Sequence, residues 1–329
     1  MNRKEYKMSG NMQSDNRAFT GMSRRDMLRT AVGAGAASAA TLTLPSCGIF
    51  EKEPETAVSR GRINQSIVYW CYAEYWDIEK TCQIARQLGC KSVELVGPEN
   101  FATLQKYGLT CAIAPCGMPD PPFVKGFNNP KYHDEIIEAT KKTIDSCAEF
   151  GVKTVIAFTG YKWRDAEDPN SGEISPDEGA QNCVKGLKKL CGYAEKKGVN
   201  VAIEILNTRA TDHPMKGHPG YQGDHTDYCI EIIKKVGSPR MKLLFDIYHV
   251  QVMDGDIISR IRQYKDYIGH YHTAGVPGRC EIDDKQEINY RAIMKEIAKT
   301  GYKGYVGQEF IPTRDPLKGL TEAVVLCDV

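Results

Sequence analysis

Four acidic or imidazole side chains stand at or near the ends of short apolar runs in the second half of the chain. They are Glu204, Asp246, His272 and Glu309. An unpaired carboxylate inside an apolar strand is costly, and the usual compensation is a partner cation, often a metal ion. Three carboxylates and one imidazole form a hard, oxygen-rich donor set that suits Mn²⁺, Mg²⁺, Co²⁺ or Zn²⁺. We therefore predict that these four residues bind one divalent metal ion and leave coordination positions for substrate oxygens.

The elements that must position these residues alternate between strand-like and helix-like segments from residue 63 onward. Asp77 and Gly89 illustrate the helix signals, because Asp is a frequent N-cap and Gly a frequent C-terminal stop. Eight strand-like segments, each followed by a helix-like one, are predicted at 63–70, 92–96, 110–114, 154–158, 200–206, 241–247, 268–273 and 305–310. This number and spacing predict a single α/β domain, a closed (β/α)8 TIM barrel. A doubly wound open sheet is the alternative, but no G-x-G-x-x-G pattern follows the first strand.

A closed barrel would bring the four predicted ligands together. The C-terminal ends of its strands share one mouth, where active sites lie, and the four residues fall late in the fifth to eighth predicted strands. His270 lies two residues before His272 and therefore on the same face of its strand. It is either a packed core residue or a second residue that lines the site. His249, just past the sixth strand, is expected to contact a substrate oxygen or to support a ligand carboxylate.

The first 47 residues carry the features of an export signal. Residues 23–28 form a twin-arginine pattern, and an apolar stretch too short to span a membrane follows at 31–44. Residues 44–47 resemble a lipobox, which would make Cys47 a lipid anchor. We predict a twin-arginine signal over 1–47, a polar tether over 48–62 and the barrel over 63–329. The expected location is periplasmic, either free or anchored as a lipoprotein.

Composition narrows the classes of partner. The chain of 329 residues has a formal net charge of +1 and lacks a basic block in its body. This argues against a nucleic-acid partner, because phosphate binding needs clustered Lys and Arg. The twelve cysteines form no CxxC pair and are expected to be buried thiols rather than zinc ligands. A small molecule is the expected partner, and a homo-oligomer is compatible with the sequence.

Several motifs in the second half of the chain resemble those of a known family. They lie at residues 201–209, 218–221, 245–251, 269–279, 287–290, 301–302 and 307–309. From residue 63 to its end, the chain is similar to the hydroxypyruvate isomerase branch of the xylose isomerase-like TIM barrels. The resemblance implies a divalent metal ion bound by the four residues named above, of which Glu204 and Glu309 would also act as the acid/base pair. It further implies that His249 and Arg279 contact the substrate.

Arg209 and Glu94 are further candidates for substrate contact. Arg209 and Arg279 can hold a substrate carboxylate through bidentate pairing, and ordinary salt bridging in loops is their alternative role. Glu94 is the carboxylate of the second predicted strand. Trp70, near the end of the first strand, is expected either to wall the pocket or to pack in the core.

The predicted function is that of a divalent-metal-dependent isomerase for a small hydroxy-carbonyl compound or sugar. A proton α to a carbonyl leaves too slowly at neutral pH unless a chelated metal ion stabilises the enediolate and two carboxylates transfer the proton. Ketose 3-epimerisation and dehydration of a sugar or cyclitol are alternatives that differ in pocket shape. A non-catalytic sugar- or metal-binding lipoprotein is the alternative from another class. The early histidines of an endonuclease IV zinc cluster are missing, since no histidine precedes His133.

Overall fold

The computed structural model describes residues 56–211 and 215–329, and the following account concerns these residues. The predicted signal over 1–47, the lipid anchor at Cys47 and part of the tether lie outside them. Among the described residues, no helix combines the length and the apolar character needed to cross a membrane.

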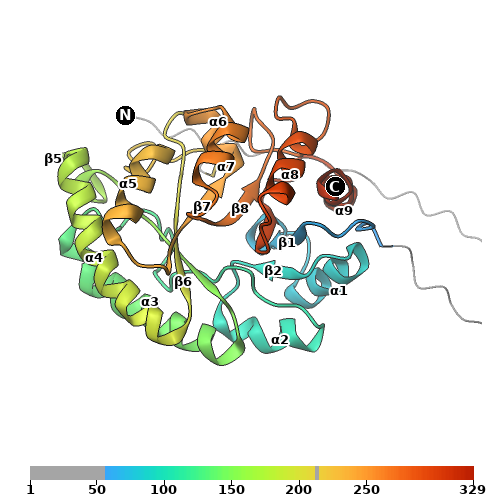
Figure 1. Ribbon diagram of the computed structural model, residues 1–329, viewed down its shortest axis with the longest axis horizontal. Coiled ribbons are helices and arrows are strands. Elements are labelled where there is room, and N and C mark those ends of the chain that lie inside the picture. Colours follow the sequence, from blue (N-terminus) through green and yellow to red (C-terminus); the bar gives the residue numbers. More distant parts are fainter. Residues whose placement is uncertain (1–55, 212–214) are drawn as a thin grey trace, which may run out of the picture. The chain divides into compact units, whose positions relative to one another are not determined.

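Seven parallel strands form the main sheet, and helices surround them (Figure 1). The order across the sheet is β2, β1, β9, β8, β7, β6, β3. The bounds are β1 (Asn64–Val68), β2 (Ser92–Glu94), β3 (Thr154–Ala157), β6 (Asn200–Glu204), β7 (Met241–Asp246), β8 (Ile268–Thr273) and β9 (Tyr305–Gln308). The strands that carry the predicted ligands, β6 to β9, are therefore neighbours.

Residues 110–114 connect the two edge strands of this sheet. Thr110 forms a parallel bridge with Ser92 of β2, and Ala114 forms one with Val155 of β3. The segment differs from the regular strand predicted for it, because the Ala112 N–H donates to Ser92 Oγ (2.8 Å) instead of to a backbone carbonyl. Seven regular strands and one irregular segment therefore close the barrel, in place of the eight regular strands that we predicted.

Local sequence signals set the ends of the helices. Asp77 caps α1 by accepting a hydrogen bond from the Lys80 N–H (2.7 Å), and Gly89 ends it with a left-handed φ of 83°. Ser175 caps α4 in the same way, and Pro176 occupies its first position. The bounds are α1 (Ile78–Leu88), α2 (Phe101–Lys106), α3 (His133–Phe150), α4 (Pro176–Lys197), α5 (Thr226–Val236), α6 (Ile247–Met253), α7 (Ile257–Tyr264), α8 (Tyr290–Lys299) and α9 (Pro316–Cys327).

Two segments differ from the elements predicted for them. The connection between β3 and α4, where no strand is predicted, contains an antiparallel hairpin, formed by β4 (Trp163–Asp165) and β5 (Asp168–Glu173). The strand predicted to reach residue 247 ends at Asp246, because α6 begins at the next residue. The Asp246 side chain accepts hydrogen bonds from the backbone N–H groups of Tyr248 and His249 and so caps this helix.

Alternation along the strands directs the predicted ligands into the barrel. Ile203 packs in the main core between the sheet and the helices, whereas Ala202 and Leu244 belong to a smaller cluster of side chains from successive strands. Because side chains alternate between the faces of a strand, Glu204 lies on the same face as Ala202. Asp246 likewise lies on the same face as Leu244. Both carboxylates therefore point to the barrel interior, at the C-terminal ends of β6 and β7.

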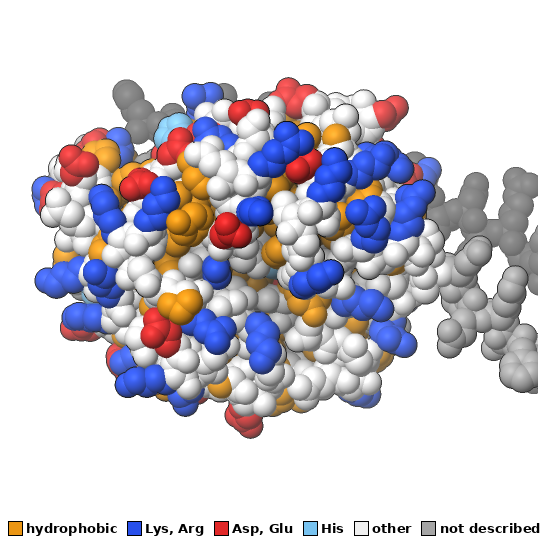
Figure 2. Space-filling view, viewed as in Figure 1, with side chains coloured by type: hydrophobic (Ala, Val, Ile, Leu, Met, Phe, Trp, Pro, Cys, Tyr) orange, Lys and Arg blue, Asp and Glu red, His pale blue; other side chains and the backbone are white. Residues whose placement is uncertain are grey.

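Charged side chains of both signs cover the surface. Figure 2 shows Lys and Arg side chains spread over the viewed face, with Asp and Glu side chains among them. Several of the exposed charges are paired, as in Lys141 with Glu138 (2.7 Å) and Lys234 with Glu231 (2.8 Å). Pairs of this kind contribute about 0–1 kcal/mol each, so the buried core contributes most of the stability.

Candidate metal centre and active-site cavity

The four predicted metal ligands meet in one buried cluster. Glu204, Asp246, His272 and Glu309 each offer one donor atom, and these four atoms lie within 4.8 Å of one another. Glu204 and Asp246 end their strands, His272 is the fifth residue of β8, and Glu309 directly follows β9. The register of the sheet contributes to this convergence, because Asp246 lies opposite His272.

The facing atoms of the cluster form no hydrogen bond with the described residues. They are Glu204 Oε1, Asp246 Oδ2, His272 Nδ1 and Glu309 Oε2, and all four are buried. His272 Nδ1 lies 2.8 Å from Glu309 Oε2 and 3.4 Å from Glu204 Oε1. A buried polar atom without a hydrogen bond costs about 1–3 kcal/mol. Because the donor set is rich in oxygen and faces inward, it fits a divalent cation.

Two of the carboxylates are oriented by hydrogen bonds to their outer oxygens. Asp246 Oδ1 accepts from the N–H groups of Tyr248 (2.8 Å) and His249 (3.2 Å), which leaves Oδ2 to face the cluster. Glu309 Oε1 accepts from the Trp70 indole N–H (3.0 Å), which leaves Oε2 to face the cluster. The cap of α6 and the indole therefore fix the inner oxygens before any ligand binds.

Glu94 contacts Nε2 of His272, the ring nitrogen that faces away from the other three predicted ligands. Glu94 Oε1 lies 2.8 Å from Nε2 of His272 and 2.8 Å from Nε2 of His270. Burial opposes ionisation of Glu94, but its interactions with the two imidazoles lower its pKa to about 2. Gly307 leaves room for this arrangement, since a Cβ at this position would lie 2.3 Å from Glu94 Oε1. With the Nε2 proton held by Glu94, His272 would offer Nδ1 to a bound cation.

The crowding of carboxylates shifts their pKa values in different directions. Burial raises the pKa of Asp246 well above its usual value, and the neighbouring Glu309 charge adds to this shift. Burial also raises the pKa of Glu204. Burial alone would raise the pKa of Glu309 too, but Arg279 and His272 hold it well below its usual value. A bound cation would favour the ionised form of all three carboxylates.

Arg279 is the cationic neighbour of the cluster. Its Nη2 lies 2.7 Å from Glu309 Oε2 and 3.6 Å from Asp246 Oδ2. The guanidinium carbon lies 5.2 Å from the centroid of the Trp70 ring and 5.7 Å from that of Tyr248. Stacking and ion pairing together hold this buried side chain beside Glu309.

The other predicted substrate contacts lie away from the cavity wall. His249 is fully buried, and its Nδ1 accepts from the Asn207 backbone N–H (2.9 Å), so the proton of the neutral ring is on Nε2. That Nε2 lies 3.6 Å from Asp246 Oδ2. Arg209 is not turned toward the cluster, because its Nη1 donates to the Val252 carbonyl (3.1 Å). Glu94, placed under His272, does not line the cavity either.

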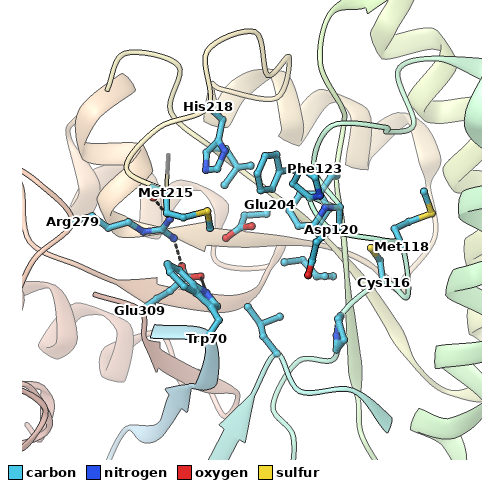
Figure 3. A pocket seen from close by; sticks show the side chains of 17 residues that line it. Trp70, Cys116, Met118, Asp120, Phe123, Glu204, Met215, His218, Arg279 and Glu309 are labelled. Carbon is cyan, nitrogen blue, oxygen red and sulfur yellow. Dashed lines mark hydrogen bonds and ion pairs between the residues drawn. The ribbon is translucent and has the colours of Figure 1, made fainter. Parts of the chain in front are cut away.

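A cavity of about 420 Å³ opens above Glu204 and Glu309 (Figure 3). Its floor includes these two glutamates, Trp70 and Arg279. The remaining lining is mostly apolar and comes largely from residues 115–123, which follow the irregular barrel segment; the full set is Trp70, Leu95, Pro115, Cys116, Met118, Asp120, Pro121, Pro122, Phe123, Ile156, Phe158, Glu204, Leu206, Met215, His218, Arg279 and Glu309.

Two features of this wall were not predicted from the sequence. The loop 115–130, rich in Pro and Gly, follows the predicted strand at 110–114, and this place in the chain is the signal for a role at the mouth of the barrel. His218 belongs to the motif at 218–221, for which no role was predicted. Its signal was the Pro219-Gly220 pair, which favours a tight turn that can fix the preceding side chain.

Comparison with known proteins agrees with the fold. The sequence pattern of the family described as "Xylose isomerase-like TIM barrel" matches residues 82–325. A putative hydroxypyruvate isomerase of Homo sapiens is 34% identical over 138 residues, 42% of this chain and 48% of the relative. The hydroxypyruvate isomerase of Escherichia coli (strain K12) is 36% identical over 137 residues, 42% of this chain and 50% of the relative. The matched part of the chain thus spans about half the length of these curated relatives.

A solved structure confirms the architecture. The crystal structure of an AP endonuclease, family 2, from Brucella melitensis superposes with a TM-score of 0.65. The match covers 78% of this chain and 97% of that one at 22% sequence identity, which supports the fold alone. The family match, by contrast, extends over most of the chain. The chain therefore belongs to the xylose isomerase-like TIM barrel family, and its sequence relatives fall in the hydroxypyruvate isomerase branch of that family.

Proposed function

We propose that this protein is a divalent-metal-dependent isomerase of a small hydroxy-carbonyl compound, in the manner of hydroxypyruvate isomerase. The observation that carries the proposal is the cluster of four buried donor atoms that reaches the cavity through Glu204 and Glu309. The names of the curated relatives support the same class of reaction. The mixed carboxylate and imidazole set favours Mn²⁺, Co²⁺, Mg²⁺ or Zn²⁺.

The two glutamates are the proton-transferring groups in this proposal. They approach the cavity floor from β6 and from the end of β9, and so from different sides. One carboxylate removes the proton from the carbon beside the carbonyl, and the other returns a proton during formation of the isomer. Trp70 keeps Glu309 in place by donating to Oε1, which leaves Oε2 directed inward.

The remaining residues position the reacting groups. When bound by Glu204, Asp246, His272 and Glu309, a divalent ion would supply Lewis-acid polarisation of the substrate carbonyl. The Arg279 guanidinium lines the cavity beside Glu309 and can donate hydrogen bonds to a substrate oxygen. The apolar wall limits the access of water to the reacting carbons.

The test is to replace each glutamate by its amide. Glu204→Gln and Glu309→Gln should each lower kcat by about 10²–10⁴-fold on hydroxypyruvate or whichever hydroxy-carbonyl compound is turned over with added Mn²⁺ or Co²⁺. The exposed Glu231, on α5, provides the control variant Glu231→Gln, which should keep full activity. Circular dichroism checks that the variants are folded. Full turnover by either cavity variant would refute the assigned roles.

A further inference from the structure

His218 lies in the cavity wall on a turn that its own sequence specifies. Residues 218–221 form a turn in which the Tyr221 N–H donates to the His218 carbonyl (3.0 Å) and Gly220 has a φ of 97°. Pro at the second position and Gly at the third suit such a turn. The turn is anchored to the end of β6, because the His218 N–H donates to the Asn207 carbonyl (2.7 Å) and the Tyr221 hydroxyl donates to the Glu204 carbonyl (2.9 Å).

The imidazole of His218 is buried but has no polar partner among the described residues. It is 2% exposed, and neither Nδ1 nor Nε2 forms a hydrogen bond within residues 56–211 and 215–329. Its ring packs against Phe123 with the centroids 4.3 Å apart in an edge-to-face arrangement. Figure 3 shows both side chains at the cavity wall, above Glu204. Two buried nitrogens without partners, on a ring that lines the cavity, indicate a polar ligand group at this place.

His218 offers a neutral recognition group. Burial, together with the charge of Arg279, lowers its pKa to about 3, so the ring is uncharged at neutral pH. A neutral imidazole has one donor and one acceptor nitrogen. This pair matches a hydroxyl group, which can accept and donate at once, better than it matches a phosphate or a carboxylate.

The charges around the cavity also disfavour a second anionic group on the ligand. Arg279 is the cationic side chain among the described residues of the lining, and its Nη2 already lies 2.7 Å from Glu309 Oε2. Asp120 adds a carboxylate to the wall. The far part of the cavity, formed by Phe123, Phe158 and their neighbours, is apolar. A volume of about 420 Å³ also exceeds what a three-carbon compound fills, since cavities of ~300 Å³ and above hold much larger ligands.

We propose that His218 is a specificity-determining residue that binds a hydroxyl group on the uncharged far end of a substrate with four or more carbons. The reacting end of that substrate would lie over Glu204 and Glu309, and its carbon chain would lie against Phe123. The inference rests on the proposed function for the position of the reacting end. It assigns the substrate to the hydroxy-carbonyl compounds that lack a distal phosphate or carboxylate.

Calorimetry on the full chain loaded with Mn²⁺ tests this assignment without requiring turnover. The probes are dihydroxyacetone, a pentulose, the same pentulose as its 5-phosphate, and a pentitol that cannot isomerise. The unmodified protein should bind the pentulose and the pentitol more tightly than dihydroxyacetone and more tightly than the 5-phosphate. His218→Phe should weaken pentulose binding about 10-fold through the lost hydrogen bond and leave dihydroxyacetone binding unchanged. His218→Gln, which keeps a donor and an acceptor, should retain most of the affinity.

The outcomes separate this inference from the proposed function. Tighter binding of the 5-phosphate than of the pentulose, or no binding of pentulose and pentitol, would overturn the role of His218, and neither result needs a variant. Unchanged pentulose affinity in a folded His218→Phe protein would overturn it as well. If the binding order holds but no probe and no hydroxypyruvate is turned over, the isomerase proposal fails and the recognition role stands.

Discussion

At the residue scale, Glu94 shows how a side chain outside the cavity can position a candidate metal ligand. Its Oε1 lies 2.8 Å from Nε2 of His270 and 2.8 Å from Nε2 of His272, and its carboxylate is fully buried. In the proposed metal-bound state a proton at Nε2 would leave Nδ1 as the metal-binding nitrogen, so Glu94 would select the tautomer of His272 that faces Glu204 and Glu309. We therefore propose that Glu94 positions a metal ligand, in place of the substrate contact predicted for it.

Replacement of Glu94 should weaken metal binding without a change in the four ligands. Glu94→Gln keeps the size of the side chain but offers a weaker acceptor, and we expect the dissociation constant for Mn²⁺ to rise about 10–100-fold. Calorimetric titration measures this change, and Glu79→Gln on the exposed side of α1 is the control that should bind like the unmodified protein. Wild-type affinity in folded Glu94→Gln would show that the tautomer of His272 does not depend on this carboxylate.

The residues that were predictable from sequence share one property. Glu204, Asp246, His272 and Glu309 interrupt apolar runs, so their chemistry is visible without a partner. The role of Glu94 was not predictable, because it depends on histidines 176 and 178 residues away and on the space left by Gly307. These are contacts across the barrel, which local spacing does not encode.

At the element scale, the two ends of the barrel sequence are joined by Asp328. This residue follows α9 and is buried, and its carboxylate accepts from the backbone N–H groups of Ser59 (2.7 Å), Arg60 (2.6 Å) and Gly61 (2.7 Å). Residues 59–61 lie just before β1, which pairs with β9. Asp328 therefore fastens the first strand beside the last one.

This junction should stabilise the barrel in a pH-dependent way. Burial opposes ionisation of Asp328, but the hydrogen bonds from Arg60, Ser59 and Gly61 lower its pKa below the ordinary value of 3.8. A lowered folded-state pKa means that the stabilisation is present above the unfolded-state pKa and is lost as the pH falls through the folded-state value.

Urea denaturation of Asp328→Ala at several pH values measures the effect. The variant should lose at least about 2 kcal/mol in free energy of unfolding at pH 7, since hydrogen bonds to a charged group contribute roughly 1.5–3 kcal/mol. The difference from the unmodified protein should shrink as the pH falls below 3.8. A difference that stays constant down to strongly acidic pH would contradict the role of the ionised carboxylate.

Helices and strands were predictable where their signals are local. The predictions were wrong where a side chain takes the place of a backbone hydrogen-bond partner. Caps such as Asp77 and stops such as Gly89 placed the helix ends close to their observed positions. The segment 110–114 departs from a regular strand because the Ser92 hydroxyl, and not a backbone carbonyl, accepts the hydrogen bond from the Ala112 N–H. Helix α6 begins inside the strand predicted over 241–247, because Asp246 is an N-cap as well as a candidate ligand.

At the scale of the whole molecule, the barrel brings residues that are far apart in the sequence close together in space. Residues 204 and 309 are separated by three strands and their helices, and yet they reach one cavity floor because β6 to β9 are neighbours in the sheet. The alternation of strands and helices was sufficient to predict this architecture. The shape of the cavity was not predictable, since it depends on how residues 115–123 and the turn at 218–221 fold over the mouth.

Metal binding is the property on which the whole account depends, and Mn²⁺ titration followed by electron paramagnetic resonance measures it most directly. We expect one Mn²⁺ per unmodified chain. Asp246→Asn should reduce the affinity by at least about 100-fold, in line with the loss of a charged ligand, yet leave the metal-free fold intact because Asn caps a helix as well as Asp does. No binding of Mn²⁺, Co²⁺ or Zn²⁺ to the unmodified chain, or equal binding by folded Asp246→Asn, would contradict the account.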